Sequence, residues 1–106
     1  MSATSPRADQ LRAMLDKAPG DAFLLYALAL ELKKLGDRPG ALEYLAKTVA
    51  VDVHYHYAYY QQGQVLESLG DVPGAKAAYD AGIAQARSAG DGKALGELEG
   101  ARDLLE

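Results

Sequence analysis

The stretch Gly36-Asp37-Arg38-Pro39-Gly40-Ala41 returns 34 residues later as Gly70-Asp71-Val72-Pro73-Gly74-Ala75, and five of the six residues are identical. A fixed period of this length is typical of proteins that stack one small supersecondary unit on the next. The same offset gives further identities outside the hexapeptide: Tyr26 with Tyr60, Leu32 with Leu66, Leu35 with Leu69 and Ala50 with Ala84. We therefore expect two copies of one unit.

The residue types of the hexapeptide predict that each unit is a helix, a tight turn and a second helix. Gly36 supplies the left-handed conformation that closes many helices. Asp37 can accept a hydrogen bond from the free N–H groups at the start of the next helix. Pro39 falls in the first turn of that helix, where its missing N–H costs nothing. Ala41 is small enough to let the two helices approach closely, and the second hexapeptide repeats these features.

Apolar residues before the first hexapeptide recur at helical spacing around most of one helix, as expected for a helix packed between neighbours. They are Phe23, Leu25, Tyr26, Ala27, Leu28, Ala29, Leu30, Leu32 and Leu35. The stretch from Val51 to Tyr59 alternates instead, which is a strand pattern. Because aromatic residues at a junction between copies also suit helix packing, we favour a helix and keep the strand as the alternative over residues 51–56.

Two more helices are expected to bracket the pair. The first begins near Ser5-Pro6 and ends at Pro19-Gly20, and the last follows Gly90 and Asp91. The apolar residues of the last helix are expected to face inward: Leu95, Leu98, Ala101, Leu104 and Leu105. The prediction is an all-α fold with about six helices. Its segments are a disordered N-terminus (1–4), a half-repeat helix (5–20), two full units (21–54 and 55–89) and a C-terminal capping helix (90–106).

Composition limits the functions that the chain could have. A formal charge of −4 over 106 residues disfavours nonspecific nucleic-acid binding, which needs clustered Lys and Arg. The absence of cysteine excludes disulfides, thiolate catalysis and cysteine-ligated zinc. The first residues lack the apolar run of a signal peptide, and no stretch approaches the roughly 18 apolar residues of a membrane span. We expect a cytoplasmic protein without a nucleic-acid or membrane partner.

At this point the sequence resembles the tetratricopeptide repeat (TPR) family. The resemblance rests on the 34-residue period, the Gly-Asp turn, and residues of matching size at matching places: Ala29 with Gly63, Leu45 with Tyr79, and a closing Pro19. The family's first-helix tryptophan is replaced by Leu25 and Tyr59. The resemblance implies a right-handed α-solenoid of antiparallel helix pairs, with two full TPR units and flanking helices.

Members of this family generally bind a peptide or a helix in a concave groove formed by the first helix of each unit. Carried over by position, the groove would present Phe23, Tyr26, Ala27, Leu30, Lys33 and Lys34 from copy one and Tyr57, Tyr60, Gln61, Gln64 and Glu67 from copy two. One subgroup of the family grips a C-terminal carboxylate with polar residues. Because Tyr26, Leu30 and Gln61 stand at such places here, we do not expect that mode of binding.

The tyrosines of the two copies could serve the groove or the packing between helices. Tyrosine is a common interface residue because it offers a large contact area, few rotors and a hydroxyl. We expect Tyr59 and Tyr79 to pack the repeat junction, whereas for Tyr26, Tyr57 and Tyr60 both roles stay open.

The sequence therefore predicts a protein-interaction module without enzymatic activity or cofactor. No nucleophile motif or glycine-rich phosphate loop supports catalysis. The alternative is a self-associating protein that dimerises through its groove or an open end, because short repeat arrays must cap or share their end faces. A remote alternative is metal binding through His54 and His56, which we expect to be exposed bystanders because no third ligand is evident.

Overall fold

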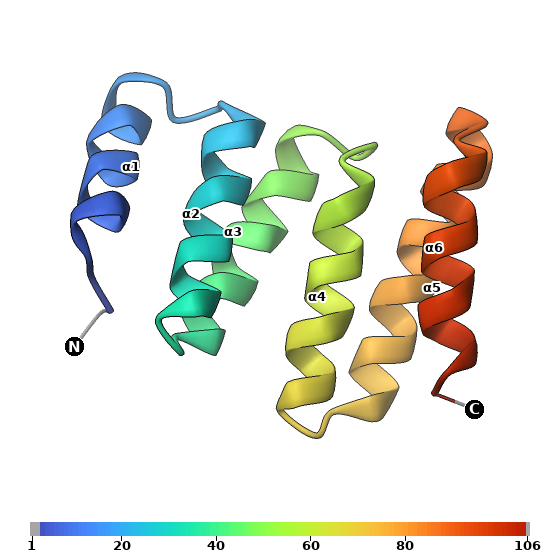
Figure 1. Cartoon of the computed structure of the whole chain (residues 1–106). Helices are drawn as coiled ribbons and strands as arrows, with labels where there is room; N and C mark the ends of the chain where they lie inside the picture. The colour runs from blue at the N-terminus through green and yellow to red at the C-terminus, as the bar shows by residue number, and fades with distance from the viewer. Residues whose placement is uncertain (1–2, 106) are drawn as a thin grey trace. The chain divides into compact units, whose positions relative to one another are not determined.

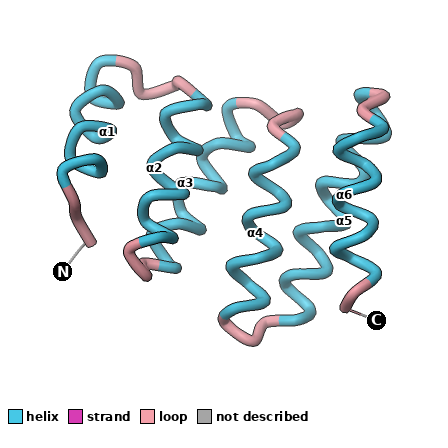
Figure 2. Tube along the Cα trace, viewed as in Figure 1, coloured by secondary structure: helices cyan, strands magenta, loops and turns pink. Residues whose placement is uncertain are grey.

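The computed structural model describes residues 3–105, which form six α-helices and no strand (Figures 1 and 2). The helices are α1 (Pro6–Lys17), α2 (Ala22–Lys34), α3 (Arg38–Val51), α4 (His56–Ser68), α5 (Val72–Ala89) and α6 (Gly92–Asp103). The predicted all-α fold with six helices is thus confirmed. Residues 52–55 form the link between α3 and α4, so over these residues both the favoured helix and the strand alternative are wrong.

The chain divides into two compact units, which we call unit 1 (Met1–Asp52) and unit 2 (Val53–Glu106). Unit 1 contains α1, α2 and α3, with α2 packed against both of the others. Unit 2 contains α4, α5 and α6, with α5 packed against both of the others. Within each unit the helices run antiparallel to their neighbours along the chain (Figure 1).

The tight turn of each hexapeptide forms as its residue types predict. Gly36 has a φ of +83°, the left-handed region in which only glycine is unstrained. The Asp37 carboxylate accepts a 2.9 Å hydrogen bond from the N–H of Gly40 and so caps α3. A Cβ on Gly40 would lie 2.8 Å from Cγ of Asp37, so the second glycine of the hexapeptide makes room for the cap. Unit 2 repeats this turn with Gly70, Asp71 and Gly74.

The core of unit 1 is built from apolar faces of α1, α2 and α3. Its buried residues include Leu11, Leu15, Leu24, Leu25, Leu28, Leu32 and Ala41. Helix α1 is also joined to α2 by polar groups, because the Ser5 hydroxyl caps α1 at Ala8 and donates a 3.0 Å hydrogen bond to buried Glu31. A buried carboxylate needs such partners.

In unit 2, two glycines allow tyrosines to pack against helix backbone. A Cβ on Gly63 in α4 would collide with the ring of Tyr79, and a Cβ on Gly82 in α5 would lie 2.7 Å from Cβ of Tyr59. The Tyr59 hydroxyl donates a 2.9 Å hydrogen bond to the carbonyl of Val53. Both tyrosines are buried, which confirms the packing role expected for them.

Two predictions at the ends of the chain need correction. Leu104 was expected to face inward, but α6 ends at Asp103 and the Leu104 side chain is 86% exposed. The predicted disorder over residues 1–4 lies outside the described residues at positions 1 and 2. Ala3 and Thr4 are described and make hydrogen bonds: the Ala3 carbonyl accepts from Arg12 at 3.1 Å, and the Thr4 hydroxyl donates to Asp9 at 2.5 Å.

Candidate functional site

The predicted groove residues of unit 1 follow one another along α2. Phe23 is 64% exposed, Tyr26 and Leu30 are half-buried, and the neighbouring Lys33 and Lys34 are exposed. Steps of three and four residues place these side chains on one face of the helix. Ala27 is 8% exposed and belongs to the core, so it offers a partner little surface. The face of α2 is therefore apolar and aromatic, with two cations at its C-terminal end.

The predicted groove residues of unit 2 lie along α4 and are more polar. Tyr57 is 44% exposed, whereas Tyr60, Gln61, Gln64 and Glu67 are half-buried. The face therefore offers one exposed aromatic ring followed by amide and carboxylate groups.

Tyr79 reaches this face of α4 from α5. Its hydroxyl donates a 2.5 Å hydrogen bond to Glu67 and accepts a 2.9 Å hydrogen bond from the Gln64 amide. Its ring also meets Tyr60 edge-on, with 6.1 Å between the ring centroids. Burial, and then the hydrogen bond to Glu67, raise the pKa of the Tyr79 phenol above its ordinary value. Two predicted groove residues are thus held in place by a buried side chain.

The sequence predicts that both histidines are exposed, but in the structure only one of them is. His54 is exposed, but His56 is only 9% exposed at the start of α4, and its Nδ1 lies 3.1 Å from Oδ2 of Asp91. Asp91 also caps α6 by accepting a hydrogen bond from the N–H of Ala94. That backbone bond, and then the contact with His56, lower the pKa of the Asp91 carboxyl. His56 therefore ties α4 to the start of α6.

In the part of the chain that the structure describes, we find neither a metal-binding cluster nor a membrane-spanning helix. Over residues 3–105, no three His, Cys, Asp or Glu side chains are grouped so that they could hold a metal ion. Nor is any of the described helices long and apolar enough to cross a membrane.

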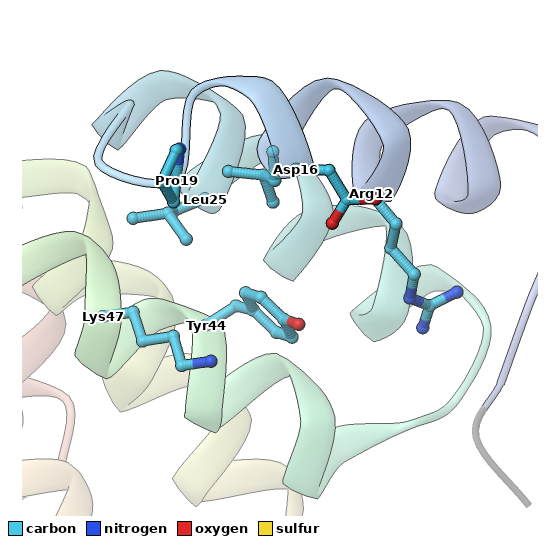
Figure 3. Close-up of a pocket in the computed structure, with 7 residues that line it drawn as sticks. Arg12, Asp16, Pro19, Leu25, Tyr44 and Lys47 are labelled. Atoms are coloured by element: carbon cyan, nitrogen blue, oxygen red, sulfur yellow. The ribbon is translucent and has the colours of Figure 1, made fainter.

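Unit 1 also contains a pocket of about 360 Å³ that the sequence did not predict (Figure 3). Its walls come from α1, the turn after α1, α2 and α3, through Arg12, Asp16, Pro19, Leu25, Tyr44 and Lys47. Its lining residues are distant from one another in the sequence, so no local pattern announces the pocket.

Comparison with known proteins places these features in context. No protein-family model matches the chain. The chain is 32% identical over 88 residues to TPR repeat-containing protein PA0015 of Pseudomonas aeruginosa, an alignment that covers 83% of this chain and 84% of the relative.

Three solved structures share the fold. Protein BPP2914 of Bordetella parapertussis has a TM-score of 0.81 and 27% identity, covering 96% of this chain and 89% of its own. A tetratricopeptide repeat domain protein of Salinibacter ruber has a TM-score of 0.73 and 35% identity, covering 80% of this chain and 94% of its own. The MamA protein has a TM-score of 0.72 and 25% identity over 92% of this chain, which spans 56% of the MamA chain.

Proposed function

Because this chain belongs to the tetratricopeptide repeat family, we propose that it is a non-catalytic interaction module that binds a peptide or a helix of a partner protein. We assign a binding face to each unit by itself: the face of α2 with Phe23, Tyr26 and Leu30 in unit 1, and the face of α4 that begins at Tyr57 in unit 2. The observation that carries this proposal is the 64% exposure of Phe23, a large apolar side chain on a helix whose other faces are mostly buried. Exposed aromatic residues are common anchors of protein interfaces.

Each face suits a different kind of contact with a partner. Phe23 and Leu30 on α2 offer apolar surface to an aliphatic or aromatic side chain of the partner. On α4, the Glu67 carboxylate and the Gln64 amide are already positioned by Tyr79. Because these groups lose little rotamer freedom when a ligand binds, polar contacts with a partner backbone cost less there.

The proposal is tested by recovery of partners with an exposed-face variant. Phe23→Ala/Tyr57→Ala removes two exposed rings, and we expect at least a tenfold loss of recovery of any specific partner from a lysate, because aromatic anchors dominate interface energies. The control is Met14→Ala/Val72→Ala, which removes two exposed apolar side chains elsewhere in the chain. Circular dichroism checks that both variants fold. Equal recovery by the two folded variants would contradict the groove assignment.

Self-association is the second candidate, and the 86% exposure of Leu104 at the end of α6 favours it. An exposed apolar side chain beside the last helix could pair with the same residue of a second copy in a twofold dimer. Size-exclusion chromatography with light scattering separates the two functions. A monomer at all concentrations supports the interaction module, and a dimer that Leu104→Ser dissociates supports self-association.

A further inference from the structure

The binding face of α4 in unit 2 carries hydrogen-bond acceptors that a neighbouring side chain holds in place. The Tyr79 hydroxyl has one proton and donates it to the Glu67 carboxylate, which can only accept. The 2.9 Å contact between the same hydroxyl and Gln64 is therefore a donation from the Gln64 amide nitrogen. The amide nitrogen of Gln64 thus faces Tyr79, and its carbonyl oxygen lies on the other side of the amide group as an acceptor.

Glu67 is a half-buried carboxylate without a cationic partner in the described residues. None of the ion pairs formed within residues 3–105 includes Glu67, whereas Glu43 pairs with Lys47 at 3.2 Å and Glu99 with Arg87 at 3.1 Å. Helix α4 contains no Lys or Arg. In unit 2, Asp and Glu outnumber Lys and Arg by eight to four, whereas the two classes are equal in unit 1. The field of unit 2 therefore favours a cation beside this carboxylate.

The first copy of the repeat has no such acceptors at the corresponding positions. The pairs at the 34-residue offset are Gln64 with Leu30, Glu67 with Lys33 and Tyr79 with Leu45. Leu45 is 1% exposed and Tyr79 is 0% exposed, so the repeat also packs with an apolar residue at this place. The hydroxyl, the amide and the carboxylate are therefore not requirements of the shared fold, and they distinguish what the face of α4 can recognise.

Two aromatic rings precede the acceptors along α4. Tyr57 is 44% exposed, and the half-buried Tyr60 ring meets Tyr79 edge-on. Aromatic faces attract cations, and the apolar stems of long basic side chains pack along apolar surface. Two acceptors on different side chains suit a guanidinium better than an ammonium, because the guanidinium carries five N–H donors in a rigid plane and stacks on aromatic rings. The chemistry of the face therefore matches arginine.

We propose that the face of α4 binds an arginine side chain in a segment of the partner protein. The guanidinium donates to the Glu67 carboxylate and to the carbonyl oxygen of Gln64, and the apolar stem packs along Tyr60. Tyr79 holds both acceptors from α5, which lies beside α4 (Figure 1). This inference rests on the proposed function, because it names the chemistry that one of the two binding faces recognises.

Matched short peptides test this chemistry directly. The probes are acetyl-Ala-Arg-Ala-amide, acetyl-Ala-citrulline-Ala-amide and acetyl-Ala-Glu-Ala-amide, titrated into the isotope-labelled full chain and followed by NMR amide shifts. Citrulline has nearly the shape of arginine but no charge. We expect roughly millimolar affinity for the arginine peptide and about threefold or more weaker binding of the other two, because one side chain makes few contacts. Equal affinity for the arginine and citrulline peptides, or no shifts along α4, would overturn the proposal.

Two charge-matched variants locate the binding at Glu67. Glu67→Gln should lower the affinity for the arginine peptide by about fivefold or more, because a charge-assisted hydrogen bond is replaced by a neutral one. Glu97→Gln removes the same charge from an exposed position on α6 and should change the affinity by less than about twofold. Equal losses in the two variants would mean general attraction by negative charge and would refute the site. If Glu67→Gln does not fold, Gln64→Leu takes its place and should lower the affinity by about threefold or more.

Tyr79→Phe tests whether the hydroxyl positions the acceptors. In the folded variant, the affinity for the arginine peptide should fall by about threefold or more relative to the citrulline peptide, because the acceptors regain rotamer freedom. A loss of stability alone would not change this ratio, and an unchanged ratio would refute the role of the hydroxyl.

Partner recovery with Phe23→Ala/Tyr57→Ala tests the proposed function separately. A specific partner that this variant loses, together with no selectivity for the arginine peptide, overturns only the present inference. Arginine selectivity that depends on Glu67, together with undiminished recovery of partners, overturns only the proposed function.

Discussion

The hydroxyl of Tyr79 in α5 lies 2.5 Å from the carboxylate Oε2 of Glu67 in α4 and donates a hydrogen bond to it. The same hydroxyl accepts from Gln64, so one buried side chain connects the two helices through polar groups at the surface of α4. Hydrogen bonds to charged groups stabilise folded proteins by roughly 1.5–3 kcal/mol. This contact therefore has consequences for stability that can be measured.

Tyr79→Phe should destabilise the protein by about 1–2 kcal/mol, because it removes the hydroxyl while keeping the ring against Gly63. Urea unfolding followed by circular dichroism measures the change. The matched control is Tyr57→Phe, which removes the hydroxyl of an exposed tyrosine and should change stability by less than about 0.5 kcal/mol. Equal effects of the two substitutions would mean that the Tyr79 hydroxyl contributes nothing specific.

Replacing two glycines within helices by alanine should change the stability of the protein in opposite directions. A Cβ on Gly63 would collide with the Tyr79 ring, so Gly63→Ala should destabilise by about 1–3 kcal/mol through overpacking. Gly96 in α6 is exposed with no atom within 4 Å of an added Cβ, so Gly96→Ala should stabilise by up to about 1 kcal/mol through helix propensity. Thermal unfolding measures whether each variant is more or less stable than the wild type. A higher unfolding temperature for Gly63→Ala would contradict the close packing of Tyr79 against Gly63.

The turns and the number of helices could be predicted from sequence because they depend on neighbouring residues. A glycine with positive φ, an aspartate cap and a proline in the first turn act within about six residues, and Gly36, Asp37 and Pro39 do so here. The contact between Tyr79 and Glu67 joins two helices, so no local pattern announces it. The residues predicted for the groove lie along α2 and α4, but the hydroxyl that contacts Gln64 and Glu67 could not be predicted.

Other features escaped prediction for different physical reasons. His56 was expected to be exposed at the junction between copies, but its contact with Asp91, the residue that caps α6, allows it to be buried. Leu104 continues the apolar spacing of α6, yet the helix ends one residue before it. The pocket is lined by side chains from three helices and a turn, so it becomes visible only when the packing of unit 1 is known.

The contact between Asp91 and His56 should make stability depend on pH in the acid range. The pKa of the Asp91 carboxyl is lowered by folding, first by the Ala94 N–H and then by His56. A lowered pKa means that the stabilisation is present above the ordinary value of 3.8 and is lost as the pH falls below it. We expect Asp91→Asn to lower the urea midpoint at pH 7 and to have a smaller effect at acid pH.

Asparagine is the matched choice in that experiment because it keeps the cap of α6 while removing the charge. Asp71→Asn at the cap of α5 is the control, since Asp71 caps its helix in the same way through Gly74. A pH dependence that is identical for the two variants would show that the histidine contact adds nothing to the cap.

Ser5 should tolerate threonine but not aspartate, although both residues are good helix caps. Its hydroxyl accepts a hydrogen bond from the N–H of Ala8 and donates one to the buried carboxylate of Glu31. Threonine keeps both functions, whereas aspartate can only accept and would bring a second negative charge towards Glu31. Arg7 lies 3.9 Å from Glu31 but is largely exposed, so it offsets little of that repulsion.

We therefore expect Ser5→Thr to unfold at nearly the wild-type urea concentration and Ser5→Asp to lose about 1–2 kcal/mol of stability at pH 7. Glu31→Gln in the Ser5→Asp background should recover part of the loss, because the amide can donate to the new carboxylate. If Ser5→Asp instead matches Ser5→Thr in stability, the serine acts only as a cap and its hydrogen bond to Glu31 does not help to hold α1 against α2.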